Sequence, residues 1–284
     1  MPRIPTTNVN AELAVAMFDD MMAANAWGLD NAWLAIAKLL MTCEVWRAPA
    51  WQNLGIMPPG TPVLMESNNY KLTRTGGPNS YMRNAMDVRD YIAGELRIPP
   101  PSLCDELGRY FQHPQVSHLQ PNNLRGHAFR SLIAQTISLY GDPALEIREE
   151  HDAHELFPGV PLATRSQDPK IDITVSRNGL IVAIVSARWT YRHDRVDMLD
   201  EAHSYIPPAR RQNPHAGFYG ATAEFGVARL AKVIEQSEPQ LPGGIVRRLV
   251  HLHAPLPREV VGHNGILGDM MDLTQFVRNS VNWI

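Results

Sequence analysis

The chain has 284 residues, of which 44% are hydrophobic and 19% are charged. This apolar content is enough for one sizeable core or two small ones, and it excludes a disordered chain and a coiled coil. The formal net charge is -3, so the molecule as a whole is not a polycation, and any basic surface that binds a polyanion must be local. Four of the 26 basic residues are Lys and the other 22 are Arg, a bias compatible with recognition of phosphates and guanine edges.

The number of cysteines and the hydropathy of the chain indicate the cellular compartment in which we expect the protein. The cysteines are Cys43 and Cys104, too few for a disulfide framework and without metal-site spacing. The apolar stretch 32–41 is broken by Lys38 and preceded by acids, so it predicts neither a signal peptide nor a membrane span. We therefore expect a cytoplasmic protein with reduced thiols and no membrane partner.

The first part of the chain is predicted to be largely helical. Apolar residues at helical spacing over 10–47, enriched in Ala and Met, predict two helices. The stretch 48–78, rich in Pro, Gly and Asn, predicts a long loop, and two further helices are expected over 87–97 and 102–112. Asn122 or Asn123 offers an N-cap for a helix of about eighteen residues that ends at Gly141.

The pattern changes after this helix. Residues 144–150 and the β-branched run 171–175 predict strands, and the turn Asn178-Gly179 predicts a hairpin with the apolar strand 180–190. Helices are expected over 194–205, 221–237 and 270–282, with a further strand over 245–251. The sequence thus predicts an α/β fold, with a helical region over 1–115 packed on a core over 116–284, together forming one compact unit.

The hairpin carries an acid and a cation at matching positions. Antiparallel neighbours bring opposite ends of their strands together, so Asp172 and Arg188 can meet. Phosphodiester cleavage needs carboxylates that hold Mg²⁺ and a cation that stabilises charge on the phosphate. An exposed ion pair on an ordinary hairpin explains the same two residues without any catalysis.

The residues that end this strand and follow it resemble a known family. Ser186-Ala187-Arg188-Trp189-Thr190 and then Arg192-His193-Asp194-Arg195 resemble the PD-(D/E)xK nucleases, specifically the type II restriction endonucleases whose targets share a CCGG or CCNGG core. In that family the catalytic Lys is followed four residues later by Arg and then, after one residue, by an acid and Arg, which read the GC pairs. Arg192, Asp194 and Arg195 fall at those steps after Arg188. The helix 124–133 also resembles the family's helix before the hairpin. The resemblance implies a central mixed sheet flanked by helices, and base readout by Arg192, Asp194 and Arg195, consistent with the hydrogen-bonding edges of G and C.

Two positions depart from the family. Arg130 stands where the family commonly has Glu, and Arg188 stands where it has Lys. Arg cannot release its proton and is bulkier than Lys, so a migrated cation is expected to orient the water, and Lys170, two residues before Asp172 on the same strand face, is the candidate. Arg188 is then expected to contact the phosphate of the substrate.

The acids that complete the metal site remain alternatives. Glu150 and Asp152 alternate by two and would point the same way in an extended chain, although a solvated acidic loop explains them equally well. Glu201 lies near the position of a migrated metal-binding Glu in some relatives, one residue short of the usual spacing. The predicted metal ligands are Asp172 with Glu150 and Asp152, and Glu201 is a further candidate for the catalytic set. The pairs His151/His154 and His251/His253 are expected to be exposed side chains rather than metal ligands.

These observations predict a Mg²⁺-dependent type II restriction endonuclease that cuts double-stranded DNA at a short palindromic site. A palindrome cut on both strands implies a homodimer, at least on DNA. A catalytically inactive DNA-binding protein on a nuclease fold is the alternative from another class. A helical protein whose hairpin resembles the family by accident is a third.

Overall fold

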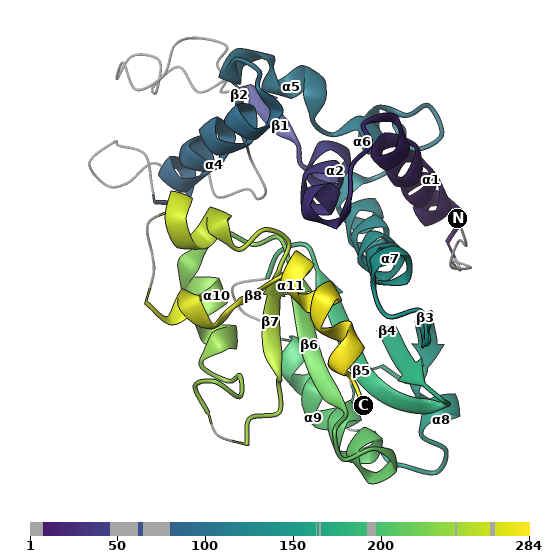
Figure 1. Cartoon of the computed structure of the whole chain (residues 1–284). Coiled ribbons are helices and arrows are strands. Elements are labelled where there is room, and N and C mark those ends of the chain that lie inside the picture. The colour runs from purple at the N-terminus through teal and green to yellow at the C-terminus, as the bar shows by residue number, and fades with distance from the viewer. Residues whose placement is uncertain are drawn as a thin grey trace.

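The computed structural model describes residues 8–45, 62–64, 80–162, 164, 166–191, 197–241, 243–261 and 265–284. Within them the chain forms a mixed six-stranded sheet of order β3-β4-β5-β6-β7-β8 with helices on its faces, and a separate two-stranded sheet of β1 and β2 (Figure 1). The predicted α/β class is therefore confirmed. The strands of the main sheet are β3 (Leu145–Asp152), β4 (Lys170–Arg177), β5 (Leu180–Arg188), β6 (Gly217–Thr222), β7 (Arg248–His251) and β8 (Met271–Asp272).

The direction of the strands changes in the middle of the sheet. β3, β4 and β5 form an antiparallel meander, whereas β5 to β8 run parallel. The carboxyl ends of β5, β6 and β7 therefore lie along one edge of the sheet. The hairpin between β4 and β5 turns at Asn178 and Gly179, whose φ values of 53° and 78° are those of the predicted tight turn.

Helices precede, interrupt and follow these strands. The α-helices are α1 (Val9–Ala24), α2 (Ala32–Leu40), α4 (Ser80–Leu96), α5 (Leu103–Glu106), α6 (Arg109–Gln112), α7 (Pro121–Tyr140), α8 (Ala153–Leu156), α9 (Asp197–Gln212), α10 (Val227–Ile234) and α11 (Leu273–Arg278). The shorter helical turns are η1 (Leu29–Asn31), η2 (Pro100–Ser102), η3 (Leu256–Val260), η4 (Ile266–Asp269) and η5 (Asn279–Asn282), and the small sheet consists of β1 (Cys43–Val45) and β2 (Pro62–Leu64).

Some elements differ from the prediction for identifiable reasons. The helix expected over 102–112 is split into α5 and α6 because Gly108 adopts a left-handed backbone, with φ of 70°. α7 begins at Pro121, whose fixed φ suits the first helical position, and its N-cap is Gln120 rather than Asn122 or Asn123. Residues 221–222 belong to β6, so the helix expected from 221 begins only at Val227. Much of the loop expected over 48–78 lies outside the described residues, although β2 falls within it.

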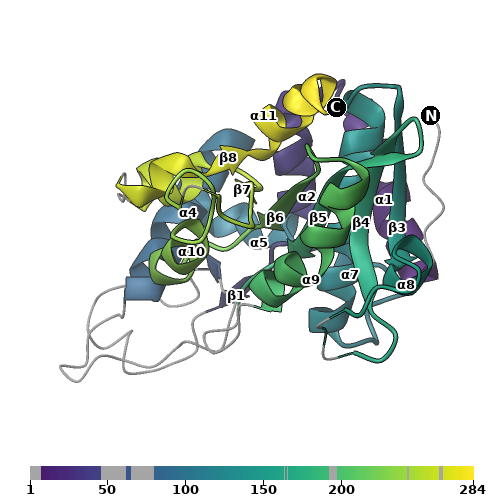
Figure 2. The same cartoon turned by 90° about the horizontal axis from the view of Figure 1, so that it is seen from below.

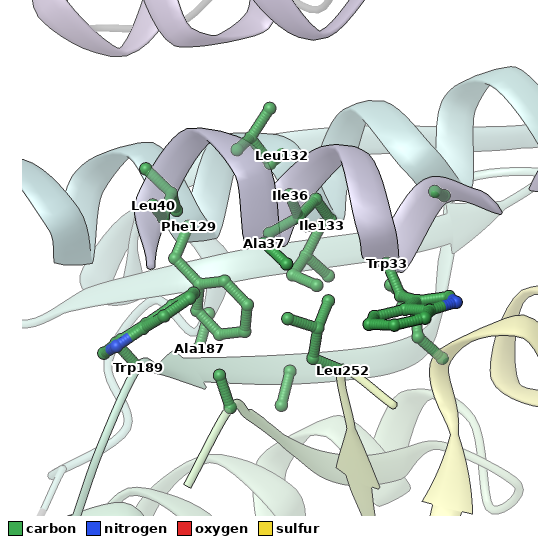
Figure 3. Close-up of a cluster of buried hydrophobic side chains, with 14 of the residues drawn as sticks. Trp33, Ile36, Ala37, Leu40, Phe129, Leu132, Ile133, Ala187, Trp189 and Leu252 are labelled. Carbon is green, nitrogen blue, oxygen red and sulfur yellow. The ribbon is translucent and has the colours of Figure 1, made fainter. Parts of the chain in front are cut away.

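The sheet is covered on both faces. On one face, α9 and α10 pack through residues such as Ile206 and Leu230 against Ile184 and Phe218 (Figures 1 and 2). On the other face lies a larger cluster, in which residues of α2 (Ile36, Ala37 and Leu40) and α7 (Phe129, Leu132 and Ile133) gather around Ala187, Trp189 and Leu252 (Figure 3). This cluster joins side chains from before and after residue 115, so the helical first part of the chain shares its core with the sheet.

In the part of the chain that the structure describes, every helix is too short or too polar to cross a membrane.

Candidate active site

Asp172 and Arg188 meet where the prediction placed them, at the carboxyl end of β5. The Nη1 atom of Arg188 donates to Oδ2 of Asp172 at 2.6 Å, and the backbone N–H of Ala187 donates to the same oxygen at 2.9 Å. A side chain at the end of β5 and the backbone beside it thus fix one carboxylate oxygen of β4. The hairpin register brings these residues together: beyond an irregularity between Val175 and Ser176, Ile173 pairs with Val185.

Glu201 joins this pair from α9. The Nη2 atom of Arg188 donates to Oε1 of Glu201 at 2.5 Å, and the Ser186 hydroxyl donates to Oε2 at 2.6 Å. The same hydroxyl lies 3.5 Å from Oδ2 of Asp172. Ser186 and Arg188 are two residues apart on one strand and therefore share the sheet face that α9 covers. Ser186 was not predicted as a site residue, although its spacing of two from Arg188 indicated that both share one sheet face.

The site is half-buried and carries perturbed charges. The side chains of Asp172, Glu201 and Arg188 are 16%, 23% and 35% exposed. Burial raises the pKa of Glu201, and the neighbouring charge of Asp172 raises it further against the opposing effect of Arg188. Burial alone would lower the pKa of Arg188, but Asp172 and Glu201 outweigh it, so that this pKa lies above its ordinary value. Two carboxylates held this close favour a cation between them.

The donor set suits a hard divalent cation. Mg²⁺ is commonly bound by one or two carboxylates, with waters and substrate phosphate completing its coordination, and Asp172 and Glu201 supply two carboxylates on one side of the sheet. No group of three or more His, Cys, Asp or Glu side chains suited to a metal occurs among the described residues. If a divalent cation binds here, the guanidinium of Arg188 must lose part of its hydrogen bonds to Asp172 and Glu201.

Lys170 and Asp152 lie apart from this cluster. Lys170 is exposed, and it pairs across the strands with Asp152. Asp152 caps α8, because its side chain accepts from the backbone N–H groups of His154 and Glu155, which lowers its pKa. The cation bonded to Asp172 is Arg188, whereas Lys170 pairs across the strands with Asp152, and the catalytic role expected of Lys170 stays a prediction.

Glu150 belongs to a second cluster, which lies between β3 and α7. Its Oε1 accepts from Nη1 of Arg130 at 2.8 Å, while Glu149 accepts from Arg130 Nε at 3.2 Å and from the Ser131 hydroxyl at 2.5 Å. Consecutive residues of a regular strand point to opposite faces, but Glu150 has φ of 48°, and this left-handed backbone lets both carboxylates reach one Arg. Glu150 and Asp152 thus have different partners, Arg130 of α7 and the N–H groups at the start of α8. Arg130 is thus the partner of two acids.

The predicted base readers lie outside the described residues. Arg192, Asp194 and Arg195 fall within the range 192–196, which the structure does not describe. Tyr191, which precedes them, is buried.

The histidine pairs differ from the expectation of exposed side chains. His251 is fully buried and contacts the backbone oxygen of Glu224 through Nε2 at 2.8 Å. His253 stacks on Trp33 with ring centroids 3.7 Å apart, and its Nε2 lies 2.9 Å from the Tyr91 hydroxyl. His151 is partly buried and contacts the Thr174 hydroxyl, whereas His154 is exposed as expected. The sequence could not show burial at 253, because Trp33 of α2 and Tyr91 of α4, which contact His253, are distant in the chain.

Comparison with known proteins gives one structural likeness. No family model and no curated protein matches the sequence. Among solved structures, the chain is similar to the restriction endonuclease PspGI in complex with substrate DNA, with a TM-score of 0.39 and 7% sequence identity, over 99% of this chain and 97% of that chain. The chemistry of the site therefore follows from its own residues.

Proposed function

We propose that this protein is a Mg²⁺-dependent endonuclease that cuts double-stranded DNA at a short palindromic site with a CCGG or CCNGG core, as type II restriction endonucleases do. The observation that carries the proposal is the convergence of Asp172 and Glu201 on Arg188 at the carboxyl end of β5. A pair of carboxylates beside a fixed cation is the arrangement that phosphodiester hydrolysis requires.

Each residue has a part in this proposal. Asp172 and Glu201 would hold Mg²⁺, which polarises the phosphate and lowers the pKa of a bound water. Arg188 neutralises charge that develops on the phosphate oxygens, since its fork suits two oxygens at once. Ser186 and the N–H of Ala187 orient the two carboxylates so that little reorganisation is needed when substrate binds. Arg192, Asp194 and Arg195 would read the GC pairs, and a homodimer would cut both strands.

A second function is favoured by one observation. Arg188 bonds both carboxylates at once, which satisfies the charges that a metal would otherwise neutralise. Under this alternative the fold binds DNA at a specific sequence without cutting it.

One experiment separates the two functions. Purified protein is incubated with phage DNA and Mg²⁺, and the products are examined for discrete bands, for a gel shift without cutting, or for neither. If the protein is an endonuclease, we expect discrete bands that disappear when EDTA is added. We also expect no bands with the Asp172→Ala variant, although circular dichroism shows that this variant is folded. A sequence-specific gel shift with intact DNA would establish the binding protein instead. The absence of both cleavage and a gel shift would contradict both proposed functions.

A further inference from the structure

Tyr205 of α9 is a buried tyrosine beside the candidate site that the proposed chemistry does not use. It is 3% exposed and packs in the apolar cluster that α9 forms with the sheet, together with Ile171, Ile184 and Phe218. A tyrosine hydroxyl can both donate and accept a hydrogen bond, and a buried one usually has a partner. Among the described residues, the Tyr205 hydroxyl has none.

The helix directs the ring of Tyr205 toward the site. Glu201 and Tyr205 are four residues apart on α9 and therefore lie on the same face of the helix, one above the other. Side chains of an α-helix lean toward its N-terminus, so the ring of Tyr205 extends back over the turn that carries Glu201. That turn is the one that Arg188, at the end of β5, bonds through Glu201. The hydroxyl end of the ring thus points toward the candidate site.

The charges of the site act on this hydroxyl. Burial raises the pKa of Tyr205 to about 12, and Glu201 and Asp172 raise it as well, against the opposing effect of Arg188. The three charged residues of the site are thus all within electrostatic reach of Tyr205. A tyrosine with this pKa keeps its proton at neutral pH, so Tyr205 brings a neutral hydrogen-bonding group to the site and no further charge.

One carboxylate oxygen of the site also has free capacity. Oδ2 of Asp172 faces the donors Ser186, Ala187 and Arg188, whereas Oδ1 accepts no hydrogen bond from a described residue. Oδ1 is therefore available to a cation. Mg²⁺ dehydrates reluctantly and keeps several waters when one or two carboxylates bind it, and the hydrogens of those waters need oxygen acceptors close by. A tyrosine oxygen without a partner is such an acceptor.

We propose that Tyr205 is a positioning residue for the divalent cation: its hydroxyl oxygen accepts a hydrogen bond from a water that the cation retains when Asp172 and Glu201 bind it. The inference rests on the proposed function, because it takes these two carboxylates as the metal ligands. Hydrogen bonds to the groups that surround a metal typically change its affinity by about 10- to 100-fold. Phe at position 205 would keep the packing of the ring and lose only the hydroxyl.

The test uses Tyr205→Phe in the full chain, with Tyr219→Phe as the matched control. Tyr219 of β6 is also buried, and its hydroxyl likewise has no hydrogen bond to a described residue. Its ring packs on Phe276 and Trp283, in the cluster on the other face of the sheet, away from the two carboxylates. Urea unfolding in EDTA checks that both variants are folded, and little change is expected because neither hydroxyl has a partner to lose.

The first measurement is the binding of Mn²⁺ in the absence of DNA, by electron paramagnetic resonance of the free ion. Mn²⁺ is a suitable probe because it also prefers carboxylate and water ligands. We expect the Kd to rise at least about tenfold in Tyr205→Phe, to stay unchanged in Tyr219→Phe, and binding to be lost in Asp172→Ala. Equal affinities of wild type and Tyr205→Phe would overturn the proposal, and so would a wild type that binds no Mn²⁺.

The second measurement is the Mg²⁺ concentration that gives half the maximal rate of cleavage of phage DNA. The proposal predicts an increase of at least about tenfold in Tyr205→Phe and none in Tyr219→Phe. An unchanged Mg²⁺ requirement in Tyr205→Phe would overturn it. If wild type binds Mn²⁺ but cuts no DNA, the proposed function fails, whereas the Mn²⁺ affinities still decide whether Tyr205 supports the bound cation.

Discussion

The guanidinium of Arg188 spans Asp172 and Glu201 with two separate nitrogens, a geometry that the single ammonium of a Lys does not reproduce. Arg188 is therefore the residue that joins the two carboxylates of the site. Its charge is permanent, so in the proposed reaction Arg188 would stabilise negative charge and would not transfer a proton.

Arg188→Ala is expected to lower the single-turnover cleavage rate by about a hundredfold or more, the range ascribed to loss of one preorganised donor. Lys170→Ala should cut at nearly the wild-type rate, because Lys170 is exposed and faces Asp152. Cleavage of a CCGG or CCNGG duplex by both variants measures this. An inactive Lys170→Ala variant together with an active Arg188→Ala variant would contradict this prediction and assign the catalytic cation to Lys170.

The raised pKa of Glu201 predicts a pH dependence of metal binding. A carboxyl whose pKa is raised keeps its proton to higher pH than an ordinary Glu, and Mg²⁺ requires the ionised form. The apparent affinity for Mg²⁺ should therefore fall as pH is lowered, beginning above the pH at which an exposed Glu protonates, about 4.3. Titration of Mg²⁺ against cleavage rate at a series of pH values measures it, and an affinity that stays unchanged until the pH at which an exposed Glu protonates would contradict the assignment.

At the scale of elements, β3 and α7 are joined by charge as well as by apolar contact. Arg130 of α7 pairs with both Glu149 and Glu150, and the side chains of Arg130 and Glu149 are 6% and 1% exposed. Burial raises the pKa of Glu149 despite its hydrogen bonds from Ser131 and Arg130. The packing of α7 on β3 thus depends on the pairing of Arg130 with the two carboxylates.

Arg130→Ala should lower the free energy of unfolding by about 3–5 kcal/mol, because it leaves the buried Glu149 carboxylate without its cation. Adding Glu149→Gln to Arg130→Ala removes that charge and should recover part of the loss. Urea unfolding of wild type, both single variants and the double variant gives the coupling energy. Strictly additive losses would show that the pair is not coupled.

The elements differ in how far local sequence determines them. The hairpin was predictable because Asn178-Gly179 and the apolar strand after it are local signals, and from it the meeting of Asp172 with Arg188 followed. β6 was missed because Gly217–Thr222 is short and buried on both faces, which removes the alternation that marks a strand. The partner of Glu150 could not be predicted, since it depends on one left-handed residue and on a helix about twenty positions earlier.

At the scale of the whole molecule, the first helices are joined to the sheet through His253. Its ring lies between Trp33 of α2, Tyr91 of α4 and Asp272 of β8. Burial lowers the pKa of both His251 and His253 to about 4. Protonation of either ring places a charge inside the contact between helices and sheet.

This burial predicts acid sensitivity of the fold. A His whose pKa is about 4 when folded and about 6.5 when unfolded binds a proton more readily in the unfolded chain, so stability falls as pH drops from about 6.5 to about 4. His251 alone would account for about 3 kcal/mol across this window. Urea unfolding at several pH values should show this slope in wild type and a shallower one in His251→Gln, and equal slopes would contradict the assignment.

The left-handed residue of β3 has a consequence for association between molecules. β3 is the first strand of the described sheet, with β4 as its neighbour, and its sequence LEIREEHD is strongly charged. A backbone irregularity and charged side chains prevent an open strand from templating the addition of another strand. The left-handed Glu150 and the charged side chains of β3 are therefore expected to disfavour intermolecular β-pairing and aggregation at this edge.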